Sequence, residues 1–147
     1  KSTREIVEHP GAVAIVAIDN NNNVLMVRQY RKAIEKVLLE IPAGKLEEGE
    51  SKEECAVREL MEETGYFPKA IKYVISFYTS PGFSNEIIHL FLATDLEKKS
   101  LEADFDEYLQ SEAIPLEEAI EKISNGQITD GKTITGLLLA RSIIGDN

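Results

Sequence analysis

Cysteine, long apolar runs and positive charge are all scarce in this sequence. The one cysteine, Cys55, cannot form a disulfide within the chain, which favours a reducing compartment such as the cytoplasm. No apolar run approaches the ~20 residues that cross a bilayer, and no signal-peptide pattern opens the chain. We therefore expect a cytoplasmic protein that does not enter a membrane.

The sequence has fewer basic than acidic residues. It contains 16 Lys and Arg and 26 Asp and Glu, which gives a formal net charge of −10. A nucleic-acid-binding surface needs a basic stripe, so we expect no nucleic-acid partner. A phosphorylated ligand would be repelled at long range, and metal ions and a few local arginines would have to overcome that repulsion. With 43% hydrophobic content, residues 1–147 are enough for one domain with its own core.

The stretch from Gly44 to Tyr66, GKLEEGESKEECAVRELMEETGY, contains many carboxylates and predicts a loop followed by a helix. Ser51 and Glu54 have the spacing of a capping box, and Gly65 stands where a left-handed C-terminal cap belongs. At about 100° per residue, the apolar side chains gather on one side of this helix. The sequence therefore predicts an amphipathic helix that begins after Ser51 and ends at Gly65.

Carboxylates crowd the boundary of that apolar side. Glu59, Glu62 and Glu63 lie beside it, and Glu50 adds a fourth from the loop. Carboxylates one turn apart repel each other, and Arg58 can relieve part of the repulsion. A solvated acidic face is the plain interpretation, but such a face usually mixes charges of both signs. Oxygen clusters of this kind suit Mg²⁺, above all when a phosphate shares its coordination sphere.

The spacing of the whole stretch resembles the Nudix box in full. The matching positions are Gly44, Glu50, Arg58-Glu59-Leu60, Glu62-Glu63 and Gly65-Tyr66. The resemblance implies a loop and helix that bind Mg²⁺ or Mn²⁺, with the metal activating water against a pyrophosphate linked to a nucleoside. The principal metal ligands of the family match Glu59 and Glu63, and the backbone carbonyl of Ala43 often joins them. The remaining box positions match supporting groups: the carboxylates of Glu50 and Glu62, and the arginine that orients them, Arg58.

Hydrophobic patterns and turn residues predict the other elements. We expect six strands, over Val13–Ile18, Val24–Tyr30, Val37–Pro42, Ile71–Tyr78, Ile87–Thr94 and Tyr108–Ile114. We expect two more helices, over Leu116–Ser124 and Lys132–Ile144, a hairpin turn over Asp19–Asn23 and a charged loop over Glu97–Glu107. This mixed order indicates an α/β domain, in agreement with the α/β/α sandwich with a mixed sheet that the resemblance implies.

Three charged residues outside the box are candidates for binding substrate. Arg28 and Arg31 lie near the end of a predicted strand, and arginine suits bidentate contact with phosphate, although a surface role is the alternative for each. Glu40 lies within an apolar run, where a carboxylate without a partner is costly. We expect Glu40 to face the site and hydrogen-bond a ligand, and a buried ion pair with an arginine is the alternative.

The box indicates a reaction class, and the substrate must be inferred from residues outside it. Pro81 lies 16 residues after Gly65, and the segments RQYR (28–31), LEIPAGK (39–45) and SPGFSNE (80–86) resemble the ADP-ribose pyrophosphatase branch. The resemblance implies hydrolysis of ADP-ribose to AMP and ribose 5-phosphate. The alternatives are hydrolysis of another nucleoside diphosphate derivative, or a non-catalytic ADP-ribose-binding sensor domain, which tends to lose the box carboxylates.

The same resemblance implies a homodimer whose substrate pocket is shared across the interface. Arg31 matches a substrate-contacting arginine and Glu86 a residue that reaches the partner's site, while Tyr30 and Phe83 are weaker candidates for stacking on adenine. Members of the branch carry an additional N-terminal β segment that builds the dimer and the adenine pocket, and the sequence leads us to expect no such segment in residues 1–147.

A charged loop over Asp104-Phe105-Asp106-Glu107 is a further candidate for the chemistry. In the ADP-ribose branch, a loop at this place carries carboxylates, one that binds metal and one proposed as the general base. Glu107 aligns best with the metal-binding position, and Asp104 or Asp106 would take the role of the base. A solvated acidic loop is the alternative.

Overall fold

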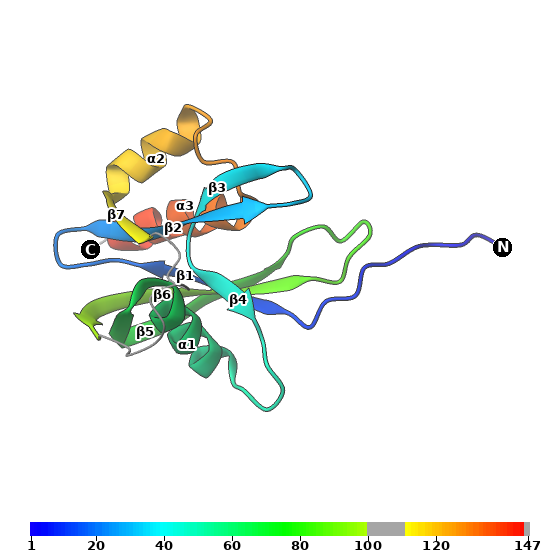
Figure 1. Ribbon diagram of the computed structural model, residues 1–147, viewed down its shortest axis with the longest axis horizontal. Helices are drawn as coiled ribbons and strands as arrows, with labels where there is room; N and C mark the ends of the chain where they lie inside the picture. The colour runs from blue at the N-terminus through cyan, green and yellow to red at the C-terminus, as the bar shows by residue number, and fades with distance from the viewer. Residues whose placement is uncertain (100–110, 146–147) are drawn as a thin grey trace.

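The computed structural model describes residues 1–99 and 111–145, which form seven strands and three helices (Figure 1). In chain order they are β1 (Ala12–Ala17), β2 (Asn23–Arg31), β3 (Lys36–Glu40), β4 (Ala43–Lys45), α1 (Lys52–Thr64), β5 (Tyr66–Tyr78), β6 (Ile87–Lys98), β7 (Ser111–Pro115), α2 (Leu116–Ser124) and α3 (Gly131–Gly145). The strands pair in two sheets, with the orders β4-β1-β6-β5 and β3-β2-β7. Strands β1 and β6 pair in parallel and the other pairs are antiparallel, so the predicted α/β fold with a mixed sheet is confirmed.

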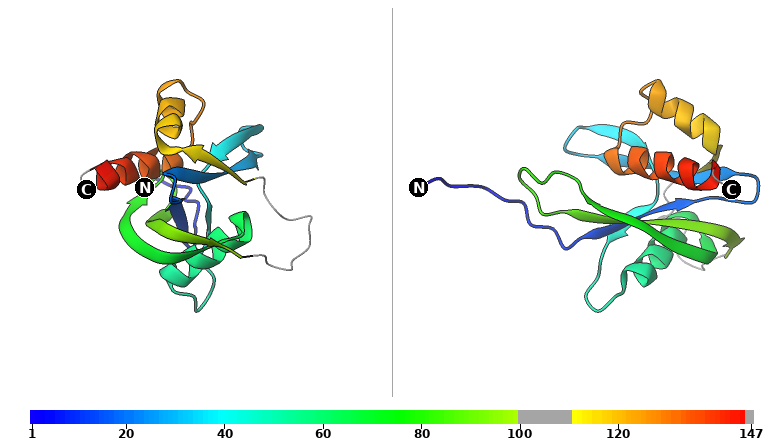
Figure 2. Two further views of the ribbon diagram at one scale, coloured as in Figure 1. Left: turned by 90° about the vertical axis from the view of Figure 1, so that its left-hand side faces the viewer. Right: turned by 180° about the vertical axis from the view of Figure 1, so that it is seen from behind.

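Strand β1 is buried on both faces and lies at the centre of the larger sheet. Because side chains alternate along a strand, Val13 and Ile15 pack with the apolar side of α1, whereas Ala14 and Val16 join a second core cluster with residues of α3. Helices α1 and α3 therefore lie on opposite sides of this sheet, and Figure 2 shows the layers from two further directions.

Helix α3 approaches the sheet closely at Gly136. A Cβ at this position would lie 2.9 Å from both Ile41 Cδ1 and Val16 Cγ2, closer than packed carbon atoms tolerate. Near its start, Thr133 Oγ1 accepts a hydrogen bond of 3.0 Å from the backbone N–H of Ile41. The beginning of α3 is thus fixed against the segment that leads into Gly44–Tyr66.

The local signals of the sequence match the structure well. Ser51 and Glu54 form both hydrogen bonds of the capping box, and Gly65 is left-handed with a φ of 75°. Asn22 has a φ of 60° in the predicted hairpin turn, where asparagine tolerates the left-handed region. The described residues contain no helix long and apolar enough to cross a bilayer.

Several predicted boundaries were wrong. The box begins with a short strand, β4, which pairs with β1 and was not predicted. Strand β5 starts at Tyr66, directly after the helix, and β6 continues to Lys98 through residues assigned to a charged loop. Tyr66 pairs with Lys98 at the ends of these two strands. Pairing between the strands therefore extends β5 and β6 beyond the apolar residues from which they were predicted. The strand predicted over Tyr108–Ile114 corresponds, in the described residues, to β7.

Candidate active site

The box folds as a strand, a loop and a capped helix, and Arg58 of α1 holds its acidic residues together. Arg58 Nε and Nη2 donate to the two carboxylate oxygens of Glu50 at 2.6 and 2.9 Å. Its Nη1 donates to Glu59 at 2.8 Å and to Glu62 at 3.2 Å. The hydrogen bond from Arg58 lowers the pKa of Glu50 to about 2, and the carboxylate of Glu50 in turn raises the pKa of Arg58. One guanidinium therefore binds three box carboxylates, and its role in orienting them for a cation stays a prediction.

Glu59 packs against the backbone of β4. A Cβ added at Gly44 would overlap the carboxyl group of Glu59, so only glycine leaves room for this side chain. Burial raises the pKa of Glu59 above its ordinary value, and the hydrogen bond from Arg58 offsets part of that rise. The first glycine of the box thus has a direct physical role, which is to let a partly desolvated carboxylate lie against the strand.

Glu63 lies one turn further along α1 and accepts a hydrogen bond of 3.3 Å from the backbone N–H of Ala43. Burial raises its pKa to about 8, and the nearby carboxylate of Glu59 adds to the rise. Two electrostatically coupled carboxylates, Glu59 and Glu63, therefore flank the backbone of Ala43 and Gly44. Such a pair of hard oxygen donors beside a backbone carbonyl suits a divalent cation that also contacts phosphate.

The described residues contain no group of three Asp, Glu, His or Cys side chains close enough together to hold a metal ion. The donors that fit a cation here are two carboxylates, Glu59 and Glu63, and the carbonyl of Ala43. Hard oxygen donors of this kind are the ligands that Mg²⁺ and Mn²⁺ prefer, and a bound cation would favour the charged forms of both carboxylates. Glu107, Asp104 and Asp106 were also predicted to act here, and all three lie outside the described residues.

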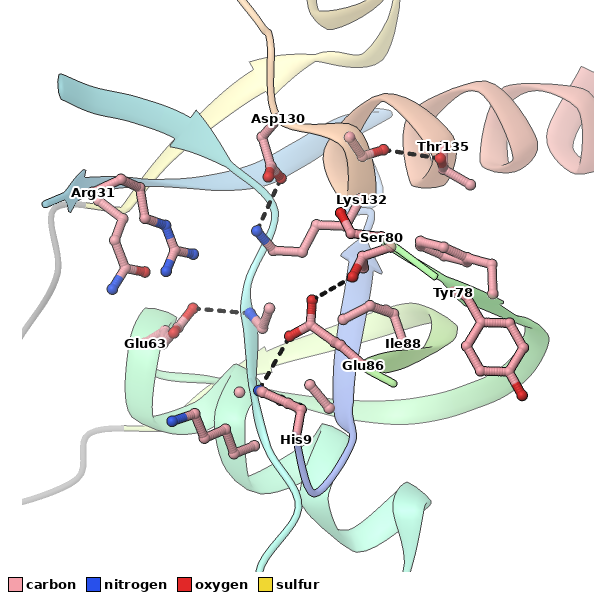
Figure 3. Close-up of a pocket in the computed structure, with 18 residues that line it drawn as sticks. His9, Arg31, Glu63, Tyr78, Ser80, Glu86, Ile88, Asp130, Lys132 and Thr135 are labelled. Atoms are coloured by element: carbon pink, nitrogen blue, oxygen red, sulfur yellow. Dashed lines mark hydrogen bonds and ion pairs between the residues drawn. The ribbon is translucent and has the colours of Figure 1, made fainter. Parts of the chain in front are cut away.

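A cavity of about 660 Å³ opens beside these carboxylates (Figure 3). The box and the residue before it contribute Ala43, Gly44, Lys45 and Glu63 to its wall. The rest of the wall comes from distant parts of the chain: His9 and Ala12, Gln29 and Arg31 of β2, residues 77–80 of β5 and the loop after it, Glu86, Ile88 of β6, and Asp130, Gly131, Lys132 and Thr135 around the start of α3. The cavity is therefore built where the box, β2 and α3 meet.

Glu40 is 1% exposed and forms a buried ionic cluster behind the cavity wall. Arg31 Nε and Nη2 donate to its two oxygens at 2.7 and 2.6 Å, and Lys132 Nζ donates to its Oε2 at 2.6 Å. Lys132 also donates to Asp130 at 2.9 Å. The expectation that Glu40 binds a ligand was wrong for this structure, because both of its oxygens are taken by cations. The alternative, a buried ion pair with an arginine, is what the structure contains.

His9 and Glu86 lie together on another side of the cavity (Figure 3). Glu86 accepts a hydrogen bond of 2.7 Å from Thr79 Oγ1, and its other oxygen lies 3.1 Å from His9 Nε2. His9 Nδ1 accepts from the backbone N–H of Gly11, so the ring proton lies on Nε2 and points at Glu86. Glu86 is thus a cavity residue of its own chain.

Three predicted substrate-binding residues do not line this cavity. Along β2, side chains alternate between the two faces, so Gln29 and Arg31 line the cavity while Arg28 and Tyr30 point away from it. Arg28 pairs with Glu112 of β7 at 3.0 Å. Tyr30 and Phe83 are 56% and 58% exposed. Arg28, Tyr30 and Phe83 therefore lie outside this cavity and Arg31 lies at it, and the binding of substrate by any of them stays a prediction.

Sequence reasoning missed Lys132, Asp130 and His9 as cavity residues. A usable signal for Asp130 was present, since aspartate directly before a helix is a common N-cap and its carboxylate accepts from the N–H of Thr133 at 3.1 Å. Lys132 carried no comparable signal, because its partner Glu40 is 92 residues away in the chain.

Comparison with known proteins agrees with this geometry. Residues 8–136 match the model of the NUDIX domain. The chain is 53% identical to the "Methanol dehydrogenase activator" of Bacillus methanolicus, covering 90% of this chain and 73% of that protein. It is 47% identical to the "ADP-ribose pyrophosphatase" of Bacillus subtilis (strain 168), covering 90% and 72%.

Among solved structures, the one described as "Crystal structure of ADP compounds hydrolase" superposes with a TM-score of 0.82 at 26% identity, covering 92% of this chain and 73% of that one. Nudix enzymes of the ADP-ribose pyrophosphatase type generally need a divalent metal. A family match over most of the chain and relatives at up to 53% identity agree with the complete box in the sequence, and the chain therefore belongs to the Nudix hydrolase family, in the branch that contains the ADP-ribose pyrophosphatases.

Proposed function

We propose that this protein hydrolyses the pyrophosphate bond of ADP-ribose, giving AMP and ribose 5-phosphate, and that the reaction depends on Mg²⁺ or Mn²⁺. The observation that carries the proposal is the position of Glu59 and Glu63 against Ala43 and Gly44, with Glu63 lining a cavity that Arg31 also lines. The printed name of the Bacillus subtilis relative favours ADP-ribose over other nucleoside diphosphate derivatives.

The carboxylates of Glu59 and Glu63, with the carbonyl of Ala43, would hold the cation. A bound Mg²⁺ or Mn²⁺ supplies charge neutralisation on the phosphoryl oxygens and a water of lowered pKa. Glu107 stays in the proposal as a third metal-binding carboxylate, with Asp104 or Asp106 as the candidate base. Glu50 and Glu62 support the site through Arg58, which binds both and keeps Glu59 in place.

The reaction needs one water molecule and no other reactant. The water oxygen forms a bond to one of the two phosphorus atoms, and the bond from that phosphorus to the bridging oxygen breaks. The bridging oxygen leaves with the other phosphate, and the attacking water loses a proton to the candidate base or to solvent. Attack at either phosphorus gives the same two monophosphates. Arg31 is proposed to bind phosphate oxygens from the cavity wall without taking part in bond breaking.

A homodimer is part of the proposal. Large apolar side chains are exposed on β5 and on the loop and N-terminal segment beside it, as expected for a surface that a second copy covers. They are Ile6, Val7, Tyr73, Ile75, Tyr78 and Phe83. Light scattering at micromolar concentration tests this, and a strictly monomeric chain would contradict it. The net charge of −10 argues against a nucleic-acid partner. We also propose a cytoplasmic location. The single cysteine, Cys55, is buried, and burial raises the pKa of its thiol to about 12, so it stays protonated and needs no disulfide partner.

Product chromatography tests the proposed reaction. The protein is incubated with Mg²⁺ and, separately, with ADP-ribose, other sugar nucleotides, an oxidised dGTP and ATP, with the Glu59→Gln variant as the inactive control. We expect AMP and ribose 5-phosphate from ADP-ribose and little turnover of ATP, because a cavity suited to a terminal ribose leaves that space empty with ATP. Much faster hydrolysis of another substrate would contradict the assignment to ADP-ribose but not to the Nudix family.

A further inference from the structure

Lys132 stands at the cavity in a way that its structural partners do not account for. Arg31 already pairs with both oxygens of the buried Glu40, so this carboxylate has its charge and hydrogen bonds matched before Lys132 is considered. Lys132 nevertheless brings a second cation to within 2.6 Å of Glu40 Oε2. A buried carboxylate that needs one cation therefore has two beside it, and both line the cavity.

The N-cap of α3 does not explain the lysine either. Asp130 Oδ2 accepts from the backbone N–H of Thr133 at 3.1 Å and from its Oγ1 at 2.6 Å, and these bonds fix the start of the helix without Lys132. Asp130 and Glu40 instead hold the lysine side chain in one orientation from two sides. A lysine side chain has high conformational entropy, and fixing it in this way prepares the ammonium group for a further ligand.

The ammonium group has one donor left. Lysine has three N–H donors, of which Glu40 and Asp130 accept two. In residues 1–99 and 111–145 no third acceptor is present for Lys132. Its side chain is 11% exposed, and that exposed part borders the cavity beside Arg31 (Figure 3). Arg31 and Lys132 are each paired with a carboxylate, and Asp130, Glu63 and Glu86 also line the cavity, so the feature that points to an anion is the remaining N–H of Lys132 beside the guanidinium of Arg31.

We infer that Lys132 binds the diphosphate group of the substrate together with Arg31, its remaining N–H donating to a phosphoryl oxygen. The inference deepens the proposed function, since it concerns how the same cavity recognises its substrate. Lys132 is a binding residue in this view, and it takes no part in breaking the bond. Because the shared chemistry is a diphosphate, inorganic pyrophosphate is a sufficient probe.

Calorimetric titration of inorganic pyrophosphate into the full chain tests the inference, in EDTA and at low ionic strength, so that neither metal binding nor turnover contributes. Lys132→Met removes the charge and keeps the length of the side chain, and we expect it to raise Kd by about ten-fold or more, because charge-assisted hydrogen bonds are the strong ones. Lys132→Arg restores a cation and should stay within about three-fold of the wild type. Lys122→Met, which removes a lysine that pairs with Glu118 on α2, is the matched control and should leave Kd unchanged.

A purely structural lysine would give a different result. Lys132→Met would then lower the melting temperature and leave the Kd for pyrophosphate unchanged, and this outcome overturns the inference, as does a wild type that binds no pyrophosphate. If Lys132→Met does not fold, the double variant Lys132→Met/Asp130→Asn removes one charge of each sign and keeps an N-capping side chain, and it must show the same loss of affinity. A wild type that binds pyrophosphate through Lys132 but fails to hydrolyse ADP-ribose would refute the proposed substrate and still support the inference.

Discussion

Glu63 should make the protein less stable at neutral pH in the absence of a cation, although we propose that catalysis requires it. Burial raises its pKa to about 8 from an ordinary value of 4.5, and the charge of Glu59 adds to the effect. The N–H of Ala43 and the charge of Lys132 offset only part of it. A buried group that must ionise at pH 8 opposes folding, so replacing it with glutamine should stabilise the metal-free protein.

The effect of Glu63 on the free energy of unfolding follows from the difference between its pKa in the folded protein and in the unfolded chain. The folded protein binds this proton more tightly than the unfolded chain, so the contribution of Glu63 to stability is fully present below about pH 4.5 and is lost as the pH rises through about 8. This pKa difference corresponds to a loss of roughly 3 to 5 kcal/mol in the free energy of unfolding between about pH 4.5 and pH 8. Glu63→Gln has no such proton, and its stability should therefore fall much less over the same range.

Urea denaturation in EDTA, followed by far-ultraviolet circular dichroism at several pH values from 5 to 9, measures this difference. The variant should equal the wild type near pH 5 and exceed it by a few kcal/mol near pH 9. Glu53→Gln, which removes an exposed carboxylate of the same helix, is the control and should follow the wild type. Parallel curves for wild type and Glu63→Gln at every pH would show that Glu63 is not held in a desolvated state. Adding Mg²⁺ at pH 8 should then stabilise the wild type but not the variant.

Three other predictions concern the same cavity. Gly44→Ala places a methyl group where the Glu59 carboxyl lies, and circular dichroism should show an intact fold while steady-state kinetics show a rate loss on the order of 100-fold. Arg31→Ala should raise KM, and a large loss of kcat with KM unchanged would point to transition-state stabilisation instead. The same variant removes two charge-assisted hydrogen bonds from the buried Glu40, which keeps Lys132 as a partner, and should lower the free energy of unfolding by about 2 kcal/mol. The affinity of the metal-free protein for Mn²⁺, measured by electron paramagnetic resonance, should rise from pH 6 to pH 8, since protons compete for the carboxylates of Glu59 and Glu63; an affinity independent of pH would contradict this.

Features encoded by residues close together in the chain could be predicted from the sequence. The helix caps at Ser51 and Gly65 follow from short-range patterns, and the structure contains both. The juxtaposition of Glu59 and Glu63 follows from their spacing of one helical turn. The position of Arg58 among the box carboxylates was likewise implied by the box itself, because all of these residues lie on one loop and one helix.

Features that depend on the side a strand presents, or on distant segments, could not be predicted. The first part of β2 is buried on both faces, so its alternation is hidden and nothing in the sequence assigns Arg31 to the cavity and Arg28 to the far side. The cluster of Glu40 with Lys132 joins residues 92 positions apart through tertiary packing alone. Glu40 was misassigned for the same reason, since its partners are visible only in the folded chain.

The two parts of the cavity wall differ in how they are inherited. Residues 43–63 form one uninterrupted stretch, so the two box carboxylates proposed to hold the cation, Glu59 and Glu63, are inherited together with the backbone they pack against. The rest of the wall comes from segments scattered between His9 and Thr135, each of which can change by a point substitution without shifting the helix that carries Glu59 and Glu63. Descendants of one ancestral gene could therefore diverge in the molecules they select while keeping the reaction, and new preferences are to be sought at those scattered positions.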